Sequence, residues 1–234
     1  MHSYVRRQNN LDFMVNDGGQ IEISDIHEVN FGLKDKPLEV DSATNLYGAG
    51  SKLTFKTIDN FNSYTKASAG ILVQADSTLS YDNVKNIYIT NEYAGTSGVR
   101  SAVQLFCNSD GSAVKPASFS ITNAETVVLH GTLSNTNSGA VGAGIVVNDR
   151  GGEYSGVKSA NLLIQAKVIS VYGSDLGIFL TRSSPDSGST NIQLEAEKNL
   201  AISVDADSSY GDAVRLTNKT GDQTDVSLKG TSIK

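Results

Sequence analysis

Apolar residues recur along this chain in pairs two positions apart, and each pair is followed by a turn residue and a second apolar pair. In the full unit, apolar residues occupy positions i and i+2, a turn residue occupies i+4, and apolar residues return at i+8 and i+10. Copies of this unit begin at Ile21, Leu38, Leu53, Leu79, Phe119, Ile192 and Val226, and a further copy contains Leu163 followed by Ile169 and Val171. Because alternation with a period of two is typical of strands, the unit predicts two short strands joined by a tight corner.

The residue types at the corner position favour a turn. This position holds Asp25, Ser42, Thr57, Asn83, Asn123, Gln165, Ala196 and Gly230. Asn and Gly adopt a positive φ at low cost, and most of the others are common in turns. The next position is mostly apolar, and it holds Ile26, Ala43, Ile58, Val84, Ala124, Ala166 and Glu197. The chain is therefore predicted to turn and then to point inward again.

A second unit follows the later copies and consists of a small residue and an apolar-x-apolar triplet. It begins at Gly70, Ala102, Gly144, Gly177 and Ala213. A small residue suits a crowded corner, where a larger side chain would strike the neighbouring coil. A single coil cannot bury its apolar face alone, so coils must stack on one another. Together the units predict an all-β fold, a right-handed parallel β-helix (β-solenoid) with three strands per coil.

The repeat also predicts how the chain is divided. Residues 1–20 are expected to form an N-terminal tail or cap, and residues 21–65 short irregular coils that lack the third strand. Residues 66–234 are expected to form the regular coils. Since the last copy runs into the C-terminus, we expect the natural protein to continue beyond it.

Composition narrows the function classes. The 25 acidic residues outnumber the 19 basic ones, which gives a net charge of −6 and argues against nucleic acid as a partner. No apolar run is long enough to span a membrane. The first residues lack the apolar core of a signal peptide, so the chain is either intracellular or a piece of a longer secreted protein. Cys107 is the only cysteine, which excludes an intrachain disulfide, and we interpret it as a small buried side chain.

Two resemblances follow from these features. The corner residues Asn83 and Asn123 resemble the tight turn of pectate-lyase-type β-helices. The variable loops, the acidic charge, the 22 glycines and the scarcity of Pro and Cys resemble the passenger regions of Gram-negative autotransporters and related large surface adhesins. This second resemblance covers roughly residues 20–234. It implies a secreted, non-catalytic fragment of a longer precursor, displayed on the bacterial cell surface for cell, host or biofilm attachment.

The same resemblance implies a glycan or a protein of a host or bacterial surface as the partner, and it leaves self-association open. Exposed aromatic side chains suit such contacts because one end is apolar and the other is polar. The tyrosines outside inward positions and near loops are the candidate ligand-binding residues, namely Tyr47, Tyr64, Tyr93, Tyr154 and Tyr210. Phe55, Tyr81 and Phe119 occupy inward positions and are predicted to lie in the core.

A carbohydrate-active enzyme is the alternative function on this fold, as a polysaccharide lyase, a hydrolase or a tailspike-type depolymerase. Such enzymes need carboxylates together with Arg or Lys on one face. The candidate catalytic residues are Asp149, Arg150 and Arg182, which follow strands of the second unit. Their register along the repeat is imperfect, so the non-catalytic interpretation is preferred.

Two further motifs are interpreted as polar loops. The segment Pro185-Asp186-Ser187-Gly188 is similar to the nucleophile segment of chymotrypsin-like proteases, but a triad also requires a histidine base with a carboxylate to orient it. The cluster of Asp205, Asp207 and Asp212 offers oxygen ligands but matches no calcium-loop template. No metal or cofactor is therefore expected.

Overall fold

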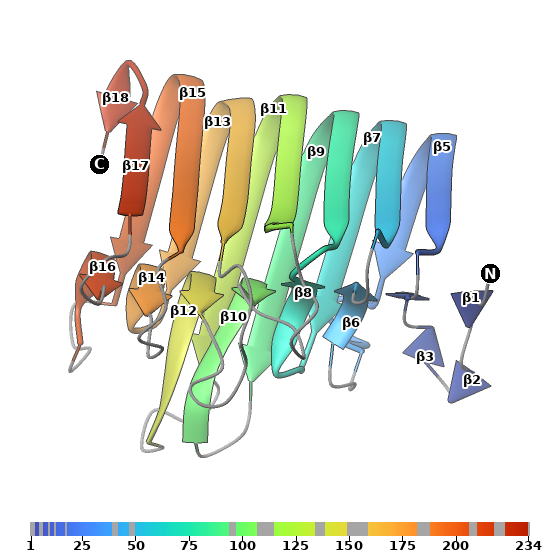
Figure 1. Ribbon diagram of the computed structural model, residues 1–234, viewed down its shortest axis with the longest axis horizontal. Coiled ribbons are helices and arrows are strands. Elements are labelled where there is room, and N and C mark those ends of the chain that lie inside the picture. The colour runs from blue at the N-terminus through green and yellow to red at the C-terminus, as the bar shows by residue number, and fades with distance from the viewer. Residues whose placement is uncertain are drawn as a thin grey trace.

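The computed structural model is all-β (Figure 1). It describes residues 3–4, 7–8, 10–11, 13–16, 18–38, 42–46, 50–93, 97–106, 115–133, 139–148, 159–181, 188–205, 210–217 and 223–233. Within these ranges the chain forms strands, turns and loops and has no helix. The all-β prediction is therefore confirmed.

Two sheets of parallel strands carry the fold. The long sheet has the order β17-β15-β13-β11-β9-β7-β5, and the short sheet has the order β1-β4-β6-β8-β10-β12-β14-β16. The long sheet contains β5 (Gln20–Phe31), β7 (Lys52–Thr65), β9 (Thr78–Tyr93), β11 (Ala117–Leu133), β13 (Ala160–Gly173), β15 (Ser189–Val204) and β17 (Gln223–Lys229), and β18 (Ser232–Ile233) also pairs with β15. The short sheet contains β1 (Ser3–Tyr4), β4 (Phe13–Val15), β6 (Ser42–Leu46), β8 (Ala69–Gln74), β10 (Ser97–Phe106), β12 (Gly139–Asn148), β14 (Leu176–Thr181) and β16 (Asp212–Thr217). The strands alternate between the sheets along the chain, so each successive pair advances one step along the stack.

The first strands extend the short sheet in a different way. β1 pairs with β4 in the antiparallel sense, whereas β4 pairs with β6 in the parallel sense. A separate two-stranded ribbon joins β2 (Arg7–Gln8) to β3 (Asn10–Leu11). These short strands lie at the N-terminal end of the stack (Figure 1).

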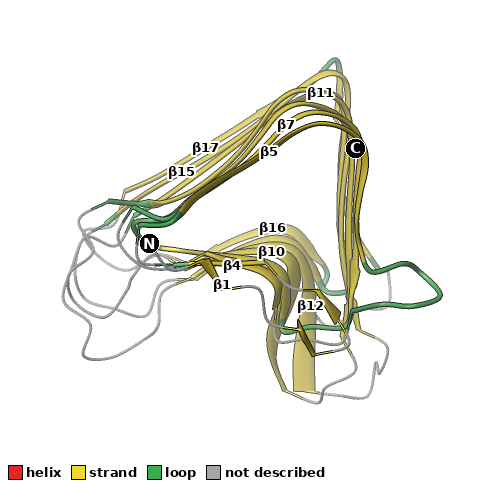
Figure 2. Cartoon of the chain, turned by 90° about the vertical axis from the view of Figure 1, so that its right-hand side faces the viewer, coloured by secondary structure: helices red, strands yellow, loops and turns green. Residues whose placement is uncertain are grey.

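The long strands bend at the predicted corner. Asp25, Thr57, Asn83 and Asn123 all have a positive φ, between 52° and 58°. Figure 2 shows the result along the stack, where the bent strands lie along two sides and the short sheet lies along a third. We call the parts before and after this corner the first and second halves of the long strands.

The positive φ does not extend to the corners of β13 and β15, since Gln165 and Ala196 are not among the described residues with a positive φ. The ladder between β11 and β13 passes from Ile121 to Ala124 on one strand while β13 advances by one residue fewer. Asn123 therefore lies in a bulge of β11 that has no counterpart in β13. The shorter corner also shifts the repeat, so that Leu162 is buried in register with Phe119, and the predicted inward position of Leu163 is wrong.

The second unit forms the short sheet as predicted. Val103 lies in register with Ile71 on one side and Ile145 on the other, and the same column continues through Ile178 and Val214. The preceding residue has to be small because the backbone of the next strand is close. A Cβ at Gly177 would lie 2.4 Å from the carbonyl oxygen of Ala213 and 2.5 Å from a methyl group of Ile202.

Two expectations for the N-terminal coils are wrong. Leu46 does not belong to a copy that begins at Leu38, because Leu46 lies in β6 and pairs with Val73 of the short sheet. Leu38 instead forms an isolated bridge with Thr65. The coils before residue 65 also do not lack the third strand, since β4 and β6 continue the short sheet in register. The pattern missed β6 because Thr44, a polar but fully buried residue, stands where Ile71 stands in the next coil.

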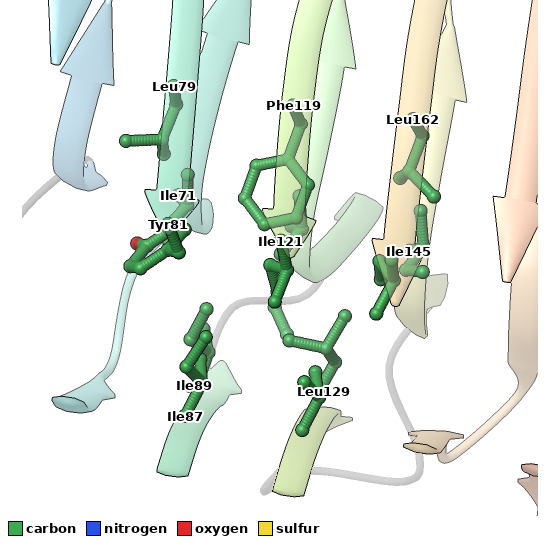
Figure 3. Close-up of a cluster of buried hydrophobic side chains, with 14 of the residues drawn as sticks. Ile71, Leu79, Tyr81, Ile87, Ile89, Phe119, Ile121, Leu129, Ile145 and Leu162 are labelled. Atoms are coloured by element: carbon green, nitrogen blue, oxygen red, sulfur yellow. The ribbon is translucent and has the colours of Figure 1, made fainter. Parts of the chain in front are cut away.

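The core lies between the sheets and is built from inward columns of apolar residues (Figure 3). Its aromatic centre joins Phe55 and Tyr81, whose rings stack at 5.0 Å, to Phe61 and Phe119. Phe55, Tyr81 and Phe119 are buried, as predicted. Aromatic pairs at such distances add stability beyond the area that they bury.

Candidate ligand-binding surface

The outward side chains of the second halves include an aromatic residue on each of four consecutive strands. These residues are Tyr64 on β7, Tyr88 on β9, His130 on β11 and Tyr172 on β13. We call this set the aromatic strip. His130 lies in register with Tyr172, and Thr90 separates it from Tyr64 in the same column. Tyr88 lies one outward position before Thr90, so the strip crosses the strands and follows the long axis of the stack.

The rings of the strip lie partly in solvent. Tyr88 is 40% exposed, and the other three members are half-buried. The rings of His130 and Tyr172 meet edge to face with centroids 5.4 Å apart. The Tyr64 hydroxyl donates a hydrogen bond to Glu92 at 3.1 Å, and the Tyr172 hydroxyl donates one to Asp205 at 2.6 Å. These carboxylates fix the polar ends of the two outer tyrosines.

The strip is uncharged at neutral pH. Burial, followed by the hydrogen bond to Asp205, raises the pKa of Tyr172 to about 12. Burial and then the hydrogen bond to Glu92 raise the pKa of Tyr64 above its ordinary value. Burial lowers the pKa of His130 below its ordinary value of 6.5. The imidazole is therefore neutral at pH 7, and the strip offers rings and hydroxyl groups without formal charge.

Amide side chains form ladders beside the strip. Asn62 donates through Nδ2 to Oδ1 of Asn30 at 2.9 Å, and Asn86 donates in the same way to Asn60 at 3.1 Å. An amide carries both donors and acceptors, so each ladder retains hydrogen-bonding capacity toward solvent. The face therefore combines apolar rings with polar groups.

Beyond the lysines next to the corner, basic residues are missing from the described outward positions of the second halves, from the register column of Asn60, Asn86 and Thr126 onward. Going along β5, β7, β9, β11, β13 and β15, these positions hold Glu28, Asn30, Asn60, Asn62, Tyr64, Asn86, Tyr88, Thr90, Glu92, Thr126, Val128, His130, Thr132, Val168, Ser170, Tyr172, Asn199, Ala201 and Ser203. The formal charges in this set are the carboxylates Glu28 and Glu92, and Asp205 adds a third beside Tyr172. The face therefore favours neutral ligands over anions.

The corner between the two halves has a different character. Asp59, Lys85, Glu125 and Lys167 form a column of alternating sign on successive strands, which we call the charge column, and His27 lies beside Asp59. His27 Nδ1 lies 2.7 Å from Asp59 Oδ2, Asp59 also pairs with Lys85, and Lys167 Nζ lies 2.9 Å from Glu125 Oε1. The hydrogen bond from Lys85 is the main cause that lowers the pKa of Asp59. These charges thus already have partners within the chain.

A shallow groove of about 390 Å³ lies at the C-terminal part of this corner. Its lining residues are Asn123, Ala124, Gln165, Ala166, Glu195, Ala196, Glu197 and Lys229. Glu195 accepts hydrogen bonds from Gln165 and from Lys229, both at 2.8 Å. The bond from Lys229 is the main cause that lowers the pKa of Glu195, so this carboxyl group is ionised at neutral pH and is not poised as a general acid.

The described tyrosines that the sequence predicts as ligand-binding residues do not form one cluster. Tyr64 belongs to the strip, and it lies within β7 rather than near a loop. Tyr93 ends β9 beneath the guanidinium of Arg100, 4.4 Å from the ring centre. Tyr210 is exposed near Arg215 in the last described part of the stack. Tyr47 and Tyr154 lie outside the described residues.

Sequence reasoning missed three members of the strip. Tyr88, His130 and Tyr172 lie within strands, whereas the search for binding residues concentrated on loops. The available signal was the outward position directly before or after an inward column residue, in four copies of the same unit. The corner shift in β13 hid this agreement, because Tyr172 comes one residue earlier in its copy than His130 does.

The candidate catalytic residues Asp149, Arg150 and Arg182 lie outside the described residues, as do Cys107, Asp186 and Asp207. Among the described acids, Asp175 accepts a hydrogen bond from the backbone N–H of Gly142 at 2.8 Å, and Asp212 lies 3.7 Å from Arg215. The described parts of the chain contain no group of three or more His, Cys, Asp or Glu side chains placed to hold a metal ion. They also contain no helix that is long and apolar enough to cross a membrane.

Comparison with known proteins gives no relative. No protein-family model, no curated protein sequence and no solved structure matches this chain.

Proposed function

We propose that the two sheets close into a right-handed parallel β-helix with three strands per coil, and that this rod is a non-catalytic surface adhesin. In this proposal the rod attaches to a glycan or a protein of a host or bacterial surface through the aromatic strip. The observation that carries the proposal is the strip itself, with one neutral aromatic side chain on each of four successive strands.

Packing requirements support a binding role for the strip. The interior of each coil is filled by apolar columns, so an outward aromatic residue is not needed to complete the core. Tyr88 leaves 40% of its surface in water, although Thr is also a favoured strand residue and would expose less apolar area. Aromatic residues that line up on one face and leave part of their rings in solvent are typical of interaction sites.

The right-handed coil is proposed from the order of the strands. Each long strand leads to a short strand and back to the next long strand, which is a crossover connection between parallel strands. Such connections are right-handed in nearly all known cases. Display on the bacterial cell surface, as part of a longer precursor, is proposed from the resemblance to autotransporter passengers.

An attachment assay tests the proposal. Particles coated with the wild-type chain are incubated with bacterial and epithelial cells, beside particles coated with the combined variant Tyr64→Ala, Tyr88→Ala and Tyr172→Ala. We expect the wild type to attach, and the variant to attach at least about tenfold less, because each ring contributes about 1 kcal/mol.

The matched control changes the outward column Thr54→Ala, Ser80→Ala and Ser120→Ala on the first halves of the same strands. This variant should attach like the wild type, and both variants should retain the wild-type circular dichroism spectrum. Equal attachment of the strip variant and the wild type would overturn the proposal, as would the absence of attachment by the wild type.

A further inference from the structure

We propose that the aromatic strip binds a neutral, extended polysaccharide that runs along the long axis of the rod, with one sugar ring on each coil. This inference rests on the proposed function and deepens it, because it names the ligand class and the binding mode of the same surface.

The spacing of the strip is the first argument. Adjacent strands of a sheet lie about 4.8 Å apart, so the strip advances by about that distance along the rod axis at each strand, which is close to the length of one sugar in an extended chain. Tyr88 is diagonal to Tyr64 and to His130, and these pairs of positions are about 7–8 Å apart. Tyr64 and Tyr172 are three strands apart, which is about 14 Å. Members in adjacent columns, such as Tyr88 and His130, are diagonal neighbours, and side chains of this size reach each other in that arrangement. A linear polymer of β-linked hexoses therefore meets one ring at each step.

The chemistry of the strip is the second argument. The faces of sugar rings carry C–H groups, which pack on the faces of aromatic rings, whereas the ring edges carry hydroxyl groups that need hydrogen-bond partners. The amide ladders that include Asn62 and Asn86 lie on the same face and provide such partners. The aromatic and amide columns thus match the two kinds of surface of a hexose.

Charge decides between neutral and acidic polymers. Glu92 and Asp205 accept hydrogen bonds from the outer tyrosines, and the described outward positions carry no Lys or Arg from the register column of Asn86 onward. The lysines nearer the corner include Lys85 and Lys167, which pair with Asp59 and Glu125. A polymer of uronic acids would place carboxylates next to Glu92 and Asp205 without a compensating cation. The ligand is therefore a neutral polysaccharide rather than an acidic one.

Titration calorimetry with oligosaccharides of increasing length tests this inference. The probes are β-linked oligomers of glucose, mannose and N-acetylglucosamine, from the disaccharide to the hexasaccharide, and galacturonate oligomers serve as the acidic control. For at least one neutral series, we expect affinity to rise with each added sugar up to the tetrasaccharide and then to level off. The galacturonate series should not bind.

Variants locate the site. Tyr64→Ala removes one end of the strip and should make affinity level off one sugar earlier, with about three- to tenfold weaker binding of the tetrasaccharide. Tyr210→Ala, which removes an exposed tyrosine that is not part of the strip, should leave binding unchanged. Affinity that does not depend on length, equal binding of galacturonate or an equal loss in Tyr210→Ala would each overturn the inference.

The two proposals fail in different ways. If cell attachment depends on the strip but no neutral oligosaccharide binds, the polysaccharide inference is wrong and a protein is the remaining partner of the strip. If cell attachment does not depend on the strip, the proposed function is wrong, and the inference falls with it.

Discussion

The two halves of each long strand are alike on the inside and different on the outside. Inward positions of both halves are apolar and buried, such as Leu79 in the first half of β9 and Ile87 in the second. The described outward positions of the first halves are mostly polar and hold no aromatic residue, whereas those of the second halves carry the aromatic strip. Because both halves pack against the same core, packing explains the likeness but not the difference. The outward difference therefore points to a requirement outside the chain, which we assign to ligand binding.

The inner likeness predicts equal losses of stability from the two halves. Phe55→Ala in the first half of β7 and Phe61→Ala in the second should each lower the free energy of unfolding by about 3–5 kcal/mol, because both rings are fully buried and leave a cavity. Urea denaturation monitored by circular dichroism measures both losses. A loss below about 1 kcal/mol for either variant would show that its half is not part of a common core.

A smaller effect of opposite sign is expected at Tyr81. Its hydroxyl group is buried and has no hydrogen-bond partner among the described residues, and burial raises its pKa well above the ordinary value. Tyr81→Phe removes this unpaired group and keeps the ring stacked on Phe55. We expect the free energy of unfolding to rise by about 1 kcal/mol. A decrease would mean that the hydroxyl group makes a favourable contact in solution.

His130 should make the stability of the folded chain depend on pH. Burial lowers the pKa of this imidazole in the folded chain, so the stability that it contributes is fully present above the ordinary pKa of 6.5. This stability is lost as the pH falls below 6.5 and through the lower folded pKa, because the unfolded chain binds the proton more readily. His130→Phe should flatten the melting temperature as a function of pH in this window. Identical slopes for the variant and the wild type would contradict the buried, neutral state of His130.

The smallest effect is expected at the charge column. Lys85 and Asp59 form an exposed pair at the corner, where water and salt screen the attraction. Lys85→Met should change the melting temperature slightly in low salt and not at all in high salt. A large change that persists in high salt would show that the corner pair is a main determinant of the fold.

The inward pattern made most of the fold predictable from the sequence. Columns such as Ile71, Val103 and Ile145 follow from alternation and spacing, because each coil repeats the same packing requirement. The pattern failed where a buried polar residue replaced an apolar one, as Thr44 does in β6, and where the corner of β13 lost a residue.

The candidate site was less predictable for a physical reason. Outward positions have no shared packing requirement, so a single Tyr88 or Tyr172 within a strand carries no signal on its own. These residues become a set only when the coils are placed in register, and the register depends on the corner lengths. Tyr64 was identified from its residue type, but its partners were not.

The central claim is that the second-half face, rather than the first-half face or the ends of the rod, contacts the ligand. Hydroxyl-radical footprinting of the chain, free and attached to the cell surface to which it binds, tests this claim most directly. The account predicts that oxidation of Tyr64, Tyr88 and Tyr172 slows on attachment, while oxidation of Tyr210 is unchanged. Protection of Tyr210 alone, or unchanged oxidation of the three strip tyrosines, would contradict it.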